Sequence, residues 1–173
     1  IRSTALDSVV AYMTAKTPAF TTKGIIQADQ ELFGQPPNSD NDGKLDALLY
    51  NIPDNYDPEG NASAIAEYVS PQDLPGSGGN GNNRDIIHLD TYPSLGNGIP
   101  ELMATAAHEY QHLIRINYDN LEVTFVDEGL SEWAELYNGF SGRLIYYLST
   151  FSIPTIGFSQ VAENNVYLLD WRS

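Results

Sequence analysis

Four stretches of this chain carry apolar residues at the spacing or density typical of helices. They run from Ser3 to about Thr17-Pro18, from Ile99 to Ile116, from about Asp127 to Tyr137, and around Leu144 to Phe151. In the first stretch, apolar side chains recur at i, i+3, i+4 and i+7, which is the period of one helix face. In the longest, Pro100 suits a first helical turn and Glu101 suits the positive end of the helix dipole. We therefore predict a helix in each stretch.

Shorter apolar runs bounded by turn residues predict strands. Leu45 to Ile52 is closed by Pro53 and indicates a buried strand, and Asp85 to Leu89 indicates another. Ile65 to Val69, between loops and prolines, is typical of an edge strand. Gly24 to Ile26 is only a short, mildly apolar piece, and Pro75 to Asn83 is rich in glycine and predicts a mobile loop. Strands before residue 99 and helices after it favour an α+β fold, with helices packed against one mixed sheet.

Composition narrows the classes of function. The 173 residues suit one domain, and 23 acidic against 8 basic residues give a net charge of −15. This charge argues against nucleic acid or an anionic membrane as a partner, and we expect a monomer. No apolar run of about 18 residues predicts a membrane span, and no signal peptide is retained. Because the chain begins at Ile1 and not at methionine, we expect a processed, secreted protein.

The most informative motif is His108-Glu109-Tyr110-Gln111-His112, inside the longest predicted helix. Two histidines four residues apart lie on the same helix face, so both imidazoles can reach one metal ion. Glu109 follows the first histidine and is placed to act as general base on a water bound to that metal. The alternative is that two unrelated histidines fall at helical spacing by chance. It is weak because the chain has only three histidines and two of them lie in this motif. The motif predicts a zinc site.

A third protein ligand is needed, because catalytic zinc usually has three and keeps one position for water. It cannot be a thiolate, since the chain has no cysteine. Arg115 and Tyr118 stand where a metzincin has glycine and a third histidine. His88 lies in an apolar strand, a setting more typical of a packed or hydrogen-bonded histidine. The remaining candidates are three carboxylates at i, i+4 and i+7, which otherwise form a solvated acidic face: Glu128, Glu132 and Glu135.

A resemblance to a known family separates these candidates. The H-E-x-x-H motif followed by Asp127-Glu128-Gly129-Leu130-Ser131-Glu132 resembles the gluzincin pattern, and is most similar to the hyicolysin family of secreted bacterial neutral metalloproteases. The close match covers only these two segments. It implies a zincin-like fold in which Glu128 on a second helix is the third zinc ligand and Glu132 is an outer partner of a zinc histidine. Asp127 and Phe125 depart from the asparagine and tryptophan common in the family.

The implied activity is zinc-dependent hydrolysis of internal peptide bonds, with Glu109 as the base. An extended protein or peptide substrate would add a strand at an exposed sheet edge, for which Ile65 to Val69 is the best candidate. The residues that would stabilise the oxyanion stay undecided among Arg143, Tyr137, Tyr146 and Tyr147. Gluzincins commonly have a helical subdomain after the third ligand, and this chain ends at residue 173. A missing C-terminal portion therefore stays open, and the alternative function is a non-catalytic zinc-stabilised binding module or an inactive protease fragment.

The acidic loop from Asn38 to Asp46 is a candidate for a second metal site. Asp40, Asp42 and Asp46 stand at positions where an EF-hand-like loop offers oxygen ligands, and Gly43 suits its sharp turn. Leu49 stands where a complete EF-hand has its bidentate glutamate. The loop is therefore a candidate for calcium, and a solvated turn before a strand explains the same residues.

Overall fold

The computed structural model describes residues 3–53, 56, 67–75 and 81–140. Their elements, in chain order, are α1 (Ser3–Thr14), α2 (Ile25–Phe33), β1 (Asp46–Tyr50), the 3-10 helix η1 (Pro71–Asp73), β2 (Ile86–Asp90), α3 (Ser94–Asn97), α4 (Ile99–Ile116) and α5 (Thr124–Tyr137). The presence of helices together with a small sheet confirms the α+β class, and the zincin-like fold stays a prediction. None of the helices in the described ranges is long and apolar enough to cross a membrane.

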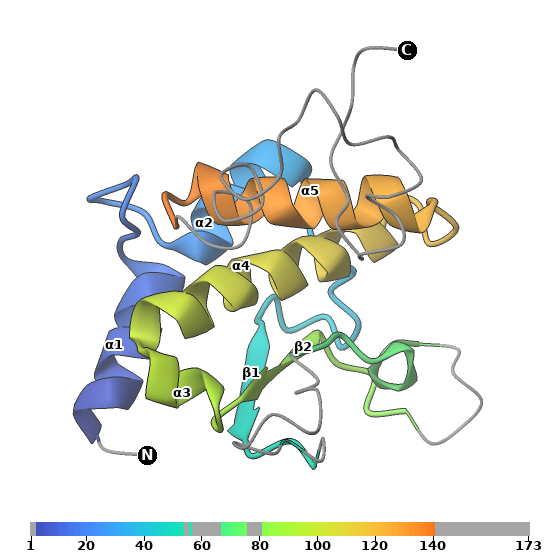
Figure 1. Ribbon diagram of the computed structural model, residues 1–173. Coiled ribbons are helices and arrows are strands. Elements are labelled where there is room, and N and C mark those ends of the chain that lie inside the picture. The colour runs from blue at the N-terminus through green and yellow to red at the C-terminus, as the bar shows by residue number, and fades with distance from the viewer. Residues whose placement is uncertain (1–2, 54–55, 57–66, 76–80, 141–173) are drawn as a thin grey trace, which may run out of the picture.

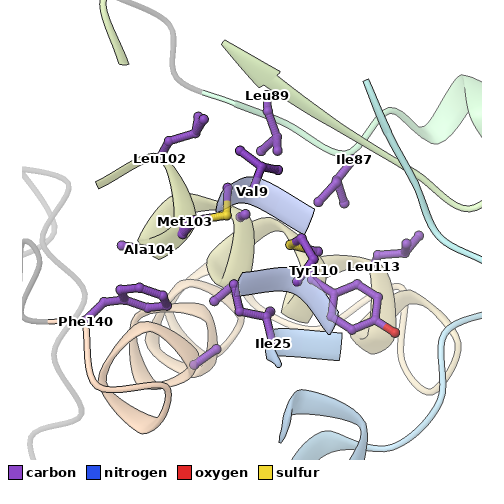
Figure 2. Close-up of a cluster of buried hydrophobic side chains, with 14 of the residues drawn as sticks. Val9, Ile25, Ile87, Leu89, Leu102, Met103, Ala104, Tyr110, Leu113 and Phe140 are labelled. Atoms are coloured by element: carbon purple, nitrogen blue, oxygen red, sulfur yellow. The ribbon is translucent and has the colours of Figure 1, made fainter. Parts of the chain in front are cut away.

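Helix α4 is the element on which the others pack. It begins and ends where predicted, from Ile99 to Ile116, after Gly98 at φ 115°, a backbone conformation that favours glycine. Helix α5 lies beside it, and α1, α2 and β2 also contact it (Figure 1). Side chains from α4 supply much of the buried cluster in Figure 2, among them Leu102, Met103, Tyr110 and Leu113. The predicted helix from Ile99 to Ile116 is confirmed, and most of its side chains are buried.

The sheet places β2 at its centre. Strands β1 and β2 are parallel, with Leu48 opposite His88, and every residue of β2 is buried. On the other side of β2, Tyr68 and His88 form an antiparallel bridge, in which each N–H donates to the carbonyl of the other residue at 3.1 and 2.9 Å. The predicted edge segment therefore pairs with β2 at Tyr68, while Ile65 and Ala66 lie outside the described residues. The sheet itself is parallel and has two strands, and the antiparallel contact is a single isolated bridge, so the predicted mixed sheet stays a prediction.

Two short α-helices, α2 and α3, and the 3-10 helix η1 were not predicted. Gly24 to Ile26 is the start of α2, where Ile25 and Ala28 are buried and Ile26 and Phe33 pack against the core from partly buried positions. The helix is only nine residues long, so its apolar period extends over little more than two turns, although this is enough to bind the helix to the core. Helix α3 spans four residues, Ser94–Asn97, which is too short for a periodic pattern. The predicted helix at Leu144 to Phe151 lies outside the described residues.

A buried carboxyl links α2 to the end of α5. The Asn138 side-chain amide donates to Asp29 Oδ1 at 2.6 Å, and both side chains are fully buried. Burial raises the pKa of Asp29 well above 3.8, and the Asn138 hydrogen bond only partly opposes this effect. The folded state thus holds a proton that the unfolded chain releases near pH 3.8. The stabilisation is present below that pH and is lost as the pH rises towards the folded-state pKa.

We expect Asp29→Asn to raise the free energy of unfolding at pH 7 by about 1 to 3 kcal/mol, because it removes an ionisable group from a buried site. The Asn138 hydrogen bond can persist, since the asparagine carbonyl also accepts. Urea unfolding at pH 5 and pH 7 measures this effect, and the variant should show a smaller loss of stability between the two values. Asp7→Asn, an exposed change on α1, is the control. Equal pH dependence in wild type and Asp29→Asn would contradict the prediction.

Candidate metal centre

Two histidines and a glutamate converge where α4 packs on α5. His108 and His112 are one turn apart on α4, and their ring centroids are 4.8 Å apart. Glu128, in the first half of α5, lies between them: its Oε2 is 3.3 Å from His108 Nε2 and its Oε1 is 3.9 Å from His112 Nε2. The three candidate ligand atoms lie within 4.8 Å of one another. The donor set fits a catalytic zinc, because two neutral nitrogens and one carboxylate leave a position for water.

The other nitrogen of each histidine faces a carboxylate on α5. His108 Nδ1 is 3.2 Å from Glu135 Oε1, and His112 Nδ1 is 2.8 Å from Asp127 Oδ1. An ionised carboxylate only accepts hydrogen bonds, so each of these contacts favours the tautomer in which Nδ1 carries the proton and Nε2 is available to a metal ion. Both rings therefore present a metal-binding nitrogen to Glu128. This arrangement of carboxylate, histidine and ligand position is typical of zinc proteins.

Sequence reasoning did not find Asp127 and Glu135 as partners of the histidines. Glu132 was predicted in that role, and the structure places one of its oxygens within 4.8 Å of a Glu135 oxygen and a His108 ring nitrogen. The role of Glu132 stays a prediction. The signal for Glu135 was its i+7 spacing from Glu128, two helical turns along the same face. Asp127 immediately precedes Glu128, and helical spacing alone did not indicate which way it points.

Glu109 is buried beside the two histidines. Burial raises the pKa of Glu109 to about 7; nearby His108 and His112 lower it, and Glu67 and Glu128 raise it further. A bound dication would stabilise the carboxylate and lower this pKa. A general base works best when its pKa lies near the working pH, so Glu109 is suited to accept a proton near neutrality.

The two carboxylates at the start of α5 stay ionised at neutral pH. The hydrogen bond with His108 is the main cause that lowers the pKa of Glu128, against the opposing effect of burial. Burial alone would raise the pKa of Asp127, but His112 and Arg115 together hold it below its usual value. Glu128 therefore supplies negative charge at the Nε2 atoms, where a cation would bind, and Asp127 supplies it at Nδ1 of His112.

His88 lies apart from this cluster, as expected for a packed histidine. Its Nε2 is 2.7 Å from Asp73 Oδ2, and its ring stacks on Tyr68 with centroids 4.3 Å apart. It belongs to neither of the two groups of potential metal ligands that the described residues form. Among the candidate oxyanion donors, Tyr137 packs on Phe20 at 5.1 Å, and the other three lie outside the described residues.

The acidic loop gives no support for calcium. Arg84 is 3.4 Å from Asp40 and 2.6 Å from Asp46, and Lys44 is 3.1 Å from Asp42. Backbone N–H groups of the loop also donate to Asp40 and Asp42. Within the described ranges these three carboxylates are not among the groups that could hold a metal. Their contacts are those of an acidic turn neutralised by neighbouring cations.

Comparison with known proteins agrees with the motif. No family model matches the chain. The chain is 34% identical over 155 residues to the neutral metalloprotease ShpI of Staphylococcus hyicus, a match that covers 79% of this chain and 34% of that protein. The chain thus spans about a third of the length of this relative. The match confirms that this chain is similar to the neutral metalloproteases of the hyicolysin type.

Proposed function

We propose that the protein is a zinc metalloendopeptidase. The observation that carries the proposal is the convergence of His108, His112 and Glu128 beside the buried Glu109. The similarity to a neutral metalloprotease supports the same reaction. We further propose that the protein is secreted and meets its protein or peptide substrates outside the cell.

In this proposal, His108, His112 and Glu128 hold the ion, in the arrangement of a gluzincin. When bound, zinc lowers the pKa of a water molecule and polarises the scissile carbonyl. Glu109 accepts the proton of the attacking water and then donates it to the leaving amine. The carboxylates of Asp127 and Glu135 keep the two imidazoles in the tautomer that leaves Nε2 free for the ion.

The substrate would lie along the segment at residues 67–69. Tyr68 directs its own N–H and C=O to His88, so the backbone groups of Glu67 and Val69 point away from β2. An extended peptide can pair with such outward groups as an added strand. Glu67 supports this placement near the motif, because its charge is one of the influences on the pKa of Glu109.

The alternative is a non-catalytic zinc-binding module or a fragment of a protease. It is favoured by one observation: the match covers only 34% of the relative. The two functions differ in whether the 173-residue chain completes a catalytic cycle.

We expect the zinc-loaded chain to cleave an unfolded protein and internal bonds of a broad peptide library. Mass spectrometry of the products measures this directly, and the chain treated with a zinc chelator is the control. Cleavage that needs zinc supports the endopeptidase. A chain that holds zinc at one equivalent and cleaves nothing supports the alternative.

A further inference from the structure

We propose that Asp127, held in place by Arg115, is a positioning residue that fixes the His112 imidazole for metal binding. This inference rests on the proposed function and adds a determinant of metal affinity beyond the three ligands. Asp127 stands where the resembling family commonly has asparagine. Its contacts give the carboxylate a specific role.

Three side chains form a continuous chain of contacts from the α4–α5 connection to the candidate metal ligand. Arg115 Nε lies 2.5 Å from Asp127 Oδ1, and the same oxygen lies 2.8 Å from His112 Nδ1. The first contact is an ion pair and not an aligned hydrogen bond. Each of the three side chains is about 15% exposed. At this depth the charges are screened less by solvent than a surface pair would be.

Arg115 is itself anchored, so it can hold Asp127 in one position. It follows His112 by three residues on α4, which places both side chains on the same side of the helix. Its Nη1 donates to the backbone carbonyl of Asp119 at 2.5 Å, in the connection between α4 and α5. The guanidinium thus ties the end of α4 to that connection while its Nε meets Asp127 at the start of α5.

A carboxylate is needed here because His112 Nδ1 has a second polar neighbour. Ser131 Oγ lies 3.1 Å from this nitrogen and donates to Gln111 Oε1 at 2.7 Å. Ser131 has a single hydroxyl proton, and Gln111 Oε1, the Asp127 carbonyl and His112 Nδ1 are all within its reach, so the hydroxyl by itself does not determine which ring nitrogen carries the proton. Asp127 only accepts, so it requires Nδ1–H. His112 Nε2 then keeps the lone pair on the side of Glu128.

The test compares the metal affinity of variants along this chain of contacts. Outer partners of metal-binding histidines typically contribute about 10- to 100-fold to metal affinity, and we expect a loss in this range for Asp127→Ala. Asp127→Asn should recover much of it, because its carbonyl still accepts from Nδ1. Arg115→Gln should weaken zinc by less than Asp127→Ala, since the carboxylate remains. Zinc affinity is measured by competition with a chromophoric chelator.

Two further measurements separate positioning from a general loss of structure. The visible spectrum of the cobalt-loaded chain reports ligand geometry, and it should change in Asp127→Ala and return towards wild type in Asp127→Asn. Melting of the metal-free chain reports folding. Asp119→Asn is the matched control: it removes a nearby negative charge, keeps the acceptor for Leu121 N–H, and leaves the Asp119 carbonyl that binds Arg115. It should not change zinc affinity.

Equal zinc affinity and equal cobalt spectra in wild type and Asp127→Ala would overturn the inference. A loss of affinity as large in Asp119→Asn would also overturn it, because overall charge would then be the cause. If Asp127→Ala does not fold, Arg115→Gln decides: unchanged zinc affinity and cobalt spectrum in that folded variant would reject the role of the ion pair. A wild-type chain that binds no zinc would instead reject the proposed function, and this inference with it.

Discussion

Glu109→Gln is expected to lower peptide hydrolysis by about 10²- to 10⁴-fold, the contribution typical of a general base, and to leave zinc bound. Glutamine has nearly the same shape and cannot accept the proton of the attacking water. The ligands are untouched, so the metal should stay. Initial rates on one internally quenched peptide, together with bound zinc per chain, measure the two effects separately.

The pH dependence should identify the same carboxyl. Glu109 must be ionised to accept a proton, so activity rises with pH through the Glu109 pKa. That pKa is about 7 in the metal-free site and lower with a dication beside it. The matched control is Glu101→Gln, an exposed change in the first turn of α4, which should keep full activity. Hydrolysis unchanged in Glu109→Gln would show that another group is the base.

Glu128→Gln is expected to remove most bound zinc. It replaces the anionic ligand between the two histidines by a neutral amide, and the loss should exceed the roughly 10- to 100-fold effect of an outer partner. Zinc content after dialysis against a weak chelator measures it. The zinc-dependent rise in melting temperature should disappear as well, because a ligand at 100 times its Kd stabilises the folded chain by about 2.7 kcal/mol.

Glu132→Gln is the comparison for this prediction, because Glu132 lies one turn further along α5 and is the same kind of residue. It should keep zinc at one equivalent, with at most the weaker affinity of a lost outer partner. If Glu132→Gln empties the site and Glu128→Gln does not, the wrong glutamate has been assigned as the ligand.

Patterns within one element could be predicted from the sequence. The limits of α4 followed from its apolar run and from Pro100 and Glu101 in its first turn. The shared position of the two histidines on one helix face followed from their spacing of four residues. Strand β1 was predicted too long by one or two residues at each end, because the apolar run continues past the backbone pairing. Helix α2 was missed because its apolar period extends over only nine residues, little more than two turns.

Contacts between elements could not be predicted in the same way. Nothing in the spacing shows that α5 packs along α4 so that Asp127 meets His112 and Glu135 meets His108. The choice of Glu128 among three glutamates came from the resemblance to a family and not from periodicity. The buried pair of Asp29 and Asn138 joins residues 109 positions apart. Aspartate and asparagine are usually exposed to solvent, so their residue types also argue against burial.

The two residues between the histidines limit how this protein could be varied. In an H-E-x-x-H motif these positions carry no chemistry, yet Tyr110 and Gln111 are fully buried here. The Tyr110 hydroxyl accepts a hydrogen bond from Gln30 on α2, and Gln111 accepts one from Ser131 on α5. They fasten the motif to both neighbouring helices. A mutant library aimed at new specificity would lose folded members at these two positions.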